Sequence, residues 1–164
     1  AQDWMTEQDL IEVNILALTR LCHALGNSMA LHGGGQILNV ASVAAFQPGP
    51  WMSTYYASKA YVLHFSEGLR EELKSCGIKV SVLCPGPTRT AFFGTAQMDT
   101  AKLDRQQLMS PEEVALHTVR ALAKNKAIIV PGRRNRWLAF SPRLSPRWLT
   151  RKIAGAINKA YCPR

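Results

Sequence analysis

Two short apolar runs, separated by one long helical pattern, constrain the fold of this 164-residue chain more than any other feature. Residues 36–40 and 78–84 are rich in aliphatic and β-branched side chains, as buried strands are. Residues 53–75 carry the helical pattern between them, and Cys76-Gly77 predicts its end. Strands that alternate with a helix in this way are typical of a parallel α/β sheet.

Flanking segments extend this alternation. Thr6 with Asp9 predicts the start of a helix that reaches about Met29. Its predicted apolar stripe consists of Leu10, Leu18, Leu21, Leu25 and Met29. The Ser-Pro-Glu-Glu run at 110–113 predicts another helix start, and residues 127–130 predict a third strand. We therefore expect about three parallel strands with flanking helices.

Three polar side chains are placed where they could exchange a proton with a substrate. Ser42 directly follows the first strand, and Tyr55 and Lys59 lie four residues apart on one face of the next helix. An ammonium beside a phenol favours the phenolate, so we expect Lys59 to lower the pKa of Tyr55. Such a phenol can transfer a proton near neutral pH, while Ser42 hydrogen-bonds the reacting oxygen. The pattern predicts a site for alcohol/carbonyl interconversion.

Each part of this pattern also has an ordinary explanation. Tyr/Lys pairs at helical spacing occur on solvated helix faces, and a serine after a strand is common in turns. The combination is more specific, because Tyr55 follows Ser42 by thirteen residues across a Pro-Gly-Pro turn. It resembles the Ser…Tyr-x-x-x-Lys pattern of the short-chain dehydrogenase/reductase family. The resemblance covers roughly residues 6–131 and only the C-terminal half of that fold, an incomplete doubly wound, Rossmann-like parallel sheet.

The resemblance assigns roles to four residues. It implies that Tyr55 is the general acid/base, that Lys59 lowers its pKa and holds the nicotinamide ribose hydroxyls, and that Ser42 positions the substrate oxygen. It also implies that Asn14, in the Val-Asn pair of the first helix, anchors a water between the lysine and solvent. From the residues alone, Asn14 could equally be a hydrogen-bonded core amide.

The resemblance also implies a nicotinamide cofactor, NAD or NADP, and a small carbonyl or alcohol substrate. The segment after the second strand resembles the part of the family's fold beside the nicotinamide. Its candidate cofactor-binding residues, besides Tyr55 and Lys59, are Pro85, Gly86, Thr88 and Thr90. A tight turn is the alternative explanation. Residues 91–108 resemble the family's substrate-covering loop in position and do not identify a substrate.

The glycine-rich turn that holds a dinucleotide pyrophosphate is not found in this sequence. The three glycines at 33–35 precede a strand, whereas the dinucleotide motif follows a strand and opens a helix. We interpret them as a connector. We therefore expect a truncated chain, which by itself binds nicotinamide cofactors weakly or not at all.

Positive charge is concentrated at the C-terminal end. Residues 1–132 hold 11 basic and 11 acidic side chains, whereas residues 133–164 hold nine basic ones and no acid. Ser145-Pro146 predicts a helix start there, and its apolar face would consist of Leu149, Ile153, Ala156, Ile157 and Ala160. We thus divide the chain into a Rossmann-like part, 1–132, and a basic amphipathic tail, 133–164. Such tails favour anionic membrane surfaces; packing on the same domain or on a partner subunit is an equal alternative, and nucleic acid a weaker one.

Further features bear on partners, location and rival functions. The helical pattern at 53–75 is apolar nearly all round, which predicts a subunit interface, and the resemblance implies a homodimer or tetramer. No secretory signal opens the sequence and the four cysteines lack paired spacing, so we expect a cytoplasmic protein, with membrane contact only through the tail. The sequence has no GxSxG motif and no metal-ligand spacing. The remaining rival is a non-catalytic dimerising module whose tail binds membranes.

Overall fold

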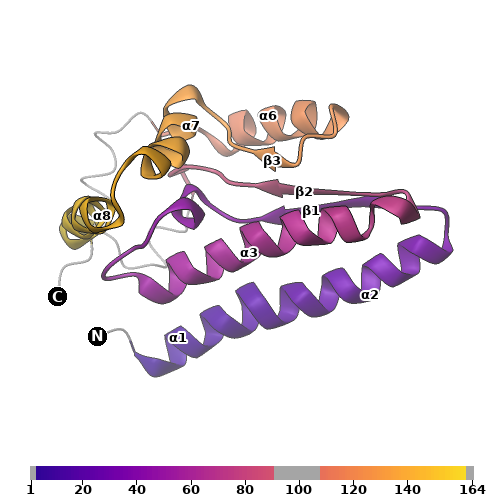
Figure 1. Ribbon diagram of the computed structural model, residues 1–164, viewed down its shortest axis with the longest axis horizontal. Coiled ribbons are helices and arrows are strands. Elements are labelled where there is room, and N and C mark those ends of the chain that lie inside the picture. Colours follow the sequence, from indigo (N-terminus) through magenta and orange to yellow (C-terminus); the bar gives the residue numbers. More distant parts are fainter. Residues whose placement is uncertain (1–2, 91–107, 162–164) are drawn as a thin grey trace.

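A three-stranded parallel sheet with helices on both faces forms the centre of the molecule (Figure 1). The computed structural model describes residues 3–90 and 108–161, except for the side chains of 160 and 161. Strands β1 (Gly35–Val40), β2 (Ile78–Leu83) and β3 (Ile128–Ile129) lie in the order β1-β2-β3. This arrangement confirms the predicted three-stranded, Rossmann-like α/β sheet. The predicted substrate-covering loop falls almost entirely outside the described residues.

The first helical segment is longer than predicted and changes its winding along its length. It consists of α1 (Trp4–Ile11), the π-helical segment η1 (Glu12–Ala17) and α2 (Leu18–Leu31). The predicted start at Thr6 is wrong, because the helix begins at Trp4 after Asp3 and has no side-chain cap. Residues before and after η1 therefore do not follow one α-helical stripe, since a π-helix has wider turns.

The predicted apolar stripe of this helix is wrong at two of its five positions. Leu21 and Leu25 are 60% and 49% exposed, whereas Cys22 and Gly26 are the buried residues of α2. Gly26 lies against Leu73, where a Cβ would come within 3.2 Å of that side chain. The small residues Cys22 and Gly26 thus allow α2 to pack closely on the rest of the chain, where Leu18 and Met29 of the predicted stripe also contact the core.

Helix α3 (Ser53–Glu72) joins β1 to β2 and packs beside α2. It ends three residues before the predicted position and continues as the 3-10 turn η3 (Lys74–Cys76). Gly77 follows with φ 71°, a left-handed conformation that favours glycine. Between β1 and α3, the 3-10 turn η2 (Val43–Phe46) begins directly after Ser42.

Helix α6 (Pro111–Ala123) covers the opposite face of the sheet (Figure 1). Its predicted start is confirmed, because Ser110 and Glu113 form a reciprocal capping box. Val80 and Val82 of β2 pack toward α3, while Leu83 packs toward α6. The crossovers β1-α3-β2 and β2-α6-β3 run in the same direction on opposite faces, so they have opposite hands.

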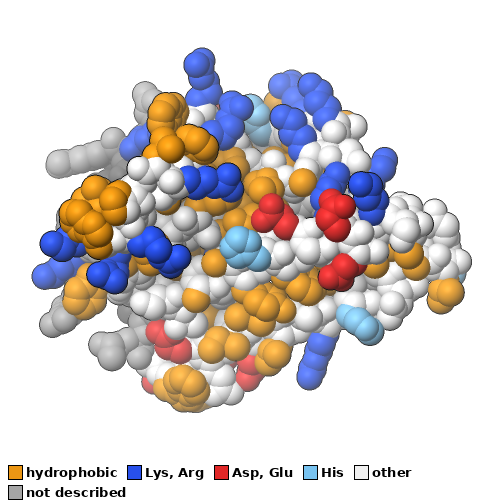
Figure 2. Space-filling view, viewed as in Figure 1, with side chains coloured by type: hydrophobic (Ala, Val, Ile, Leu, Met, Phe, Trp, Pro, Cys, Tyr) orange, Lys and Arg blue, Asp and Glu red, His pale blue; other side chains and the backbone are white. Residues whose placement is uncertain are grey.

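The basic C-terminal segment folds into α7 (Arg133–Phe140), η4 (Ser141–Leu144) and α8 (Arg147–Tyr161). Helix α7 was not predicted, because its Arg-rich sequence shows no clear apolar period. Figure 2 shows Lys and Arg side chains around α6, α7 and α8, whereas the acidic side chains on this face lie over α1 and α3. Along the described residues, no helix combines the length and apolar character needed to cross a bilayer.

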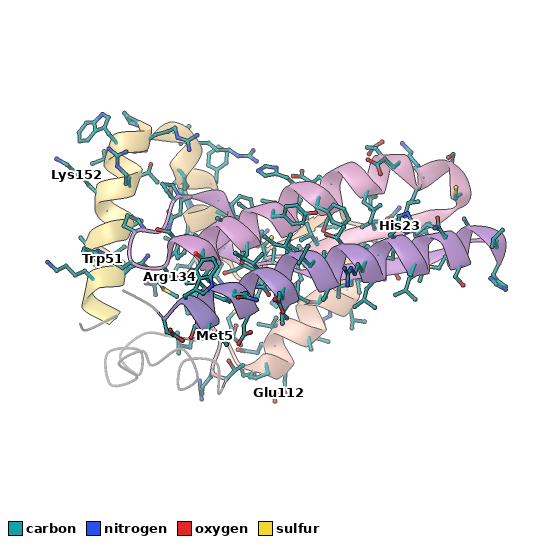
Figure 3. All side chains as sticks on the ribbon, turned by 90° about the horizontal axis from the view of Figure 1, so that it is seen from below. Met5, His23, Trp51, Glu112, Arg134 and Lys152 are labelled. Atoms are coloured by element: carbon teal, nitrogen blue, oxygen red, sulfur yellow. The ribbon has the colours of Figure 1, made fainter. Side chains whose placement is uncertain are left out.

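Helix α8 lies across the end of the sheet at which β1 and β2 finish, near the start of α3 (Figures 1 and 3). Asn158 fixes it there by two hydrogen bonds. Its amide donates to the carbonyl of Pro50 at 3.0 Å, and its oxygen accepts from the hydroxyl of Tyr56 at 3.0 Å. The tail helix therefore packs on the rest of the chain, while the division at residue 133 stays a prediction.

Candidate active site

The ends of β1 and β2 form the edge that carries the candidate site. Backbone hydrogen bonds hold the residues beyond the two strands together, from Ala41 N to Leu83 O at 2.7 Å and from Val43 N to Pro85 O at 3.0 Å. Ser42 lies between these two bonds and is 9% exposed. Its hydroxyl accepts a hydrogen bond from Ala44 N at 3.1 Å and so caps η2. Ligands of open parallel sheets bind at such carboxyl ends.

Tyr55 and Lys59 come to the same edge from the first turns of α3. The phenol of Tyr55 forms a hydrogen bond with the hydroxyl of Ser42. The ammonium of Lys59 lies 5.9 Å from the centre of the Tyr55 ring. The structure thus brings the three predicted residues together, although they come from a strand end and from two turns of a helix.

Asn14 completes a chain of polar contacts beside these residues. Lys59 Nζ donates to the carbonyl oxygen of Val40 at 3.2 Å and approaches Asn14 Oδ1 at 3.5 Å. Asn14 Nδ2 donates to Ser58 Oγ at 3.1 Å, and Ser58 donates to the carbonyl of Tyr55 at 2.8 Å. The side chain of Asn14 is therefore hydrogen-bonded toward the lysine, and it projects from the π-helical segment η1.

Sequence reasoning missed Ser58. Its side chain is 1% exposed and links Asn14 to the backbone of Tyr55. The available signal was a hydroxyl one residue before Lys59 in an otherwise apolar stretch of helix. A buried hydroxyl requires a partner, and in a helix it can donate to the carbonyl of the preceding turn.

The predicted lowering of the Tyr55 pKa is wrong in direction. Burial raises the pKa of Tyr55 above its ordinary value, and the hydrogen bond with Ser42 opposes this only in part. Burial also lowers the pKa of Lys59, because desolvation disfavours its charged form. The sequence indicated the neighbouring charge but not the depth at which both groups lie. In this structure the proton is held more firmly on the phenol than in water.

The segment after β2 forms a compact turn held from two sides. Thr88 Oγ1 donates to the carbonyl of Gly86 at 2.9 Å, and Thr90 Oγ1 approaches the carbonyl of Thr88 at 3.4 Å. The backbone of Arg89 donates to Met109 O at 3.1 Å, which ties the turn to the chain before α6. The predicted cofactor-binding residues Pro85, Gly86, Thr88 and Thr90 thus lie on one ordered turn beside Ser42.

The position of Asn135 in α7 leaves no room for a side chain at residue 86, which is a glycine. A Cβ at Gly86 would collide with the Asn135 amide group. That amide is fixed by donation to Pro131 O at 2.8 Å. The unpredicted helix α7 therefore packs directly on the turn after β2, and sequence reasoning missed Asn135 because no local pattern marked it.

The residues at this edge fit the nicotinamide end of a dinucleotide. An ammonium has three donors, and Lys59 directs two of them at Val40 and Asn14, which leaves one for a ribose hydroxyl. The hydroxyls of Ser42 and Tyr55 lie beside it. Among the described residues, no glycine-rich turn leads from a strand into a helix, so a pyrophosphate site of that kind is not found there.

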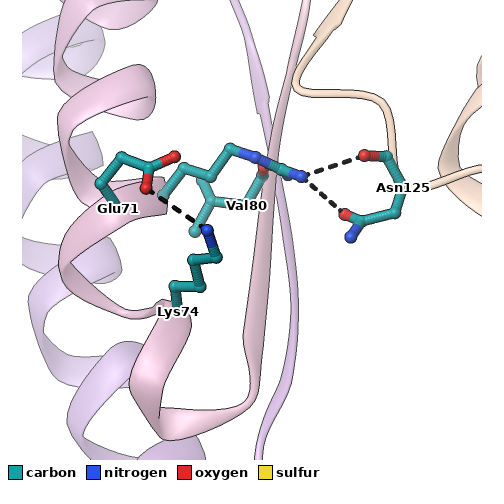
Figure 4. Close-up of polar contacts among 5 residues, drawn as sticks. Glu71, Lys74, Val80 and Asn125 are labelled. Atoms are coloured by element: carbon teal, nitrogen blue, oxygen red, sulfur yellow. Dashed lines mark hydrogen bonds and ion pairs between the residues drawn. The ribbon is translucent and has the colours of Figure 1, made fainter.

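A separate hollow of about 270 Å³ lies at the opposite end of the sheet, lined by residues that include Arg70, Lys74 and Asn125. Arg70 already donates to the carbonyl of Val80 and to both oxygens of Asn125, and Lys74 pairs with Glu71 at 3.8 Å. Figure 4 shows the contacts at Asn125 and between Lys74 and Glu71. Because Arg70, the strongest hydrogen-bond donor in this hollow, already joins α3 to the turn before β3, we do not place the active site there. No cluster of three metal-ligating side chains occurs in the part of the chain that the structure describes.

Known proteins are similar to this chain in both sequence and fold. The short chain dehydrogenase family profile matches residues 2–101. Ketoacyl reductase HetN from Nostoc sp. is 34% identical over 120 residues, which are 73% of this chain and 41% of that protein. Hydroxysteroid dehydrogenase-like protein 1 from Gallus gallus is 34% identical over 118 residues, covering 72% of this chain and 35% of that protein. The chain therefore belongs to the short-chain dehydrogenase/reductase family, which confirms the resemblance.

Solved structures agree with this assignment. A short-chain dehydrogenase from Sphingobium yanoikuyae in complex with NADPH is 33% identical, with a TM-score of 0.76 over 87% of this chain and 56% of that one. A 7β-hydroxysteroid dehydrogenase structure has a TM-score of 0.77 at 21% identity, covering 93% and 60% of the two chains, and supports the fold alone. The chain spans about two fifths of the ketoacyl reductase that it matches.

Proposed function

We propose that the protein carrying this chain interconverts a carbonyl and a secondary alcohol by hydride transfer with NAD or NADP. The observation that carries the proposal is the hydrogen bond between Ser42 and Tyr55 beside the Lys59 ammonium, at the carboxyl ends of β1 and β2. Membership of the short-chain dehydrogenase/reductase family supports it. The family match does not favour the rival reading as a non-catalytic dimerising module.

The roles of the chain's own residues follow from this arrangement. A nicotinamide, when bound, would supply or accept the hydride. Ser42 would hold the substrate oxygen, and Tyr55 would donate its proton to that oxygen as a carbonyl is reduced. Because burial raises the pKa of Tyr55, the phenol is protonated at neutral pH, which suits it to act as the acid in reduction. Lys59 and Asn14 would pass a replacement proton toward the phenol.

Cofactor contacts are proposed for Tyr55, Lys59 and the turn after β2. Lys59 would donate to the ribose hydroxyls, and Pro85, Gly86, Thr88 and Thr90 would contact the nicotinamide carboxamide. Since the 164 residues contain no glycine-rich turn for the pyrophosphate, this chain alone should bind NADPH weakly or not at all. Titration of NADPH into the purified chain tests this, and micromolar affinity would contradict it.

The activity can be tested in a fusion that supplies the absent nucleotide-binding half. The chain would be joined behind the corresponding half of the Sphingobium yanoikuyae enzyme, which shares its fold. NADPH oxidation with a panel of ketones would then be compared for the fusion and its Tyr55→Phe and Tyr61→Phe variants. Tyr61 is the matched control, since it lies on the same helix and its hydroxyl contacts Thr19 at 2.8 Å.

The expected result is a loss of at least about a hundredfold for Tyr55→Phe, as proton transfer typically contributes 10²–10⁴-fold. Tyr61→Phe should keep most of the rate. A Tyr55→Phe variant that keeps more than about a tenth of the rate is incompatible with the proposed role. Circular dichroism of each variant separates lost chemistry from lost folding.

We also propose that the protein forms homodimers or tetramers through α2 and α3. Support comes from large apolar side chains that α1, η1 and α2 leave exposed, such as Val13 at 66%, Leu16 at 49% and Leu21 at 60%. Apolar surface of this extent along one helix is typical of an interface. Light scattering of the wild type and Leu21→Asp tests this, and equal masses for both would contradict it.

A further inference from the structure

A second surface stands out at the end of the molecule formed by α7, η4 and α8. It leaves large apolar side chains between 47% and 70% exposed. We call it the basic aromatic surface, and its apolar members are Trp137, Leu138, Phe140, Leu144, Trp148, Ile153 and Ile157. Single exposed apolar side chains are common on protein surfaces, whereas a group of seven on three consecutive elements is typical of an interaction site.

The apolar side chains of α8 are exposed because this helix packs through a different face. The buried residues of α8 are Thr150, Ala154 and Asn158, which lie four residues apart on one side of the helix. The predicted apolar face contains Ile153 and Ile157, which are 52% and 51% exposed. At 100° per residue, this face lies about a quarter turn from the buried one. Hydrogen bonds from Asn158 to Pro50 and Tyr56 hold the helix in this orientation.

Positive charge surrounds the same apolar side chains. All Arg and Lys side chains of 133–159 are exposed, and residues 133–164 contain no acid. The ion pairs found among residues 3–90 and 108–161 do not involve α7, η4 or α8. Lys152 Nζ lies 5.6 Å from the Trp148 ring, and Lys159 Nζ lies 5.9 Å from the ring of Trp51. Figure 2 shows this end as apolar groups bordered by blue side chains.

We propose that the basic aromatic surface docks on an anionic lipid bilayer, with α8 lying in the plane of the headgroups. Its apolar side chains would enter the acyl boundary, and its Arg and Lys side chains would meet lipid phosphates. A nucleic acid would satisfy only the charges, because a phosphate backbone gives exposed Ile and Leu side chains nothing to pack on. A second copy of this chain would bring like charges together.

Vesicle co-sedimentation tests the docking on the 164-residue chain itself. The probes are vesicles of phosphatidylcholine alone and vesicles in which one third of the lipid is phosphatidylglycerol. Arg151→Glu/Lys152→Glu is compared with Lys124→Glu/Lys126→Glu, which makes the same charge change at exposed residues beyond α6. We expect binding to the anionic vesicles only, weakened at least about thirtyfold by the α8 variant and little by the control.

A second pair of variants tests the apolar contribution. Trp148→Ser/Ile153→Ser should weaken vesicle binding about tenfold or more, whereas Leu116→Ser/Val119→Ser on α6, where the side chains are 51% and 64% exposed, should not. Equal binding to both vesicle types, or equal losses in variant and control, would overturn the proposal. So would a Trp148/Ile153 variant that turns a dimer into a monomer without changing lipid binding. Tight binding of duplex DNA with no vesicle binding would assign the surface to nucleic acid instead.

Discussion

The edge at the carboxyl ends of β1 and β2 and the basic aromatic surface lie at the same end of the molecule, but their polar side chains differ in burial. At the edge, the side chains of Asn14, Ser58 and Lys59 are partly or wholly buried and bond to one another or to backbone. On α7 and α8, the charged side chains point outward. A buried polar group must find its partner within the chain, so its position is fixed. An exposed charge leaves its partner to be found outside. The first arrangement suits chemistry, and the second suits docking.

Replacing one lysine in each region gives the largest expected difference. In the fusion enzyme, Lys59→Met should lower kcat/KM by about a hundredfold or more, because it removes both the ribose contact and the charge beside Tyr55. Lys152→Met, on α8, should leave kcat/KM nearly unchanged while it weakens vesicle binding. Steady-state kinetics and co-sedimentation check both. Equal losses of kcat/KM in the two variants would erase the distinction between the regions.

Removing one serine hydroxyl in each region should separate them in stability. Ser58→Ala leaves Asn14 Nδ2 without its buried partner, which should cost about 1–3 kcal/mol of unfolding free energy. Ser141→Ala removes only an exposed contact to Leu138 O at 3.3 Å and should change it by less than about 0.5 kcal/mol. Urea unfolding of both variants measures the difference. A Ser58→Ala variant as stable as the wild type would show that the network carries no stability.

Alkaline pH offers a smaller test of burial at the edge. Cys84 is 0% exposed, and burial raises the pKa of its thiol to about 12. The folded state therefore holds this proton more tightly than the unfolded state. Its contribution to stability is complete below about pH 9 and falls by about 1.4 kcal/mol per pH unit above it. Cys84→Ala should lose this pH dependence, and Cys76→Ala, at an exposed position, should retain it. Identical slopes in urea unfolding at alkaline pH would refute the assignment.

The contact between the two regions should give the smallest effect. The hydroxyl of Tyr56 donates to Asn158 Oδ1, which joins α3 to α8. A double-mutant cycle with Tyr56→Phe and Asn158→Ala should give a coupling of about 0.5–1.5 kcal/mol in unfolding free energy. Additive effects would mean that α8 is held by its apolar contacts alone.

The central β1-α3-β2 unit could be predicted because its signals are local. Strand composition, a helical pattern and a stopping glycine each act within a few residues, and parallel strands necessarily bring Ser42 and Pro85 to one edge. The four-residue step from Tyr55 to Lys59 fixed their common face in the same way. These features required no knowledge of what packs against them.

Other features depend on contacts between distant segments and could not be predicted. Three features reflect tertiary partners: the π-helical winding of η1, the orientation of α8 that buries Asn158, and the packing of Asn135 on Gly86. The pKa of Tyr55 is the clearest case. A neighbouring lysine can be found from spacing, but the burial that raises the pKa of Tyr55 exists only in the fold.

The central claim is that the Ser42 hydroxyl and the Tyr55 phenol share one small, buried volume. Titration of Tyr55 by NMR in the chain itself, with isotope-labelled tyrosine, tests this without cofactor or substrate. We expect the pKa of Tyr55 to lie above the ordinary tyrosine value. It should be still higher in Ser42→Ala, because the hydrogen bond with Ser42 lowers the pKa in the wild type. Ser75→Ala, exposed in η3, is the control. A Tyr55 pKa at or below the ordinary value, or one that does not change in Ser42→Ala, would contradict the account.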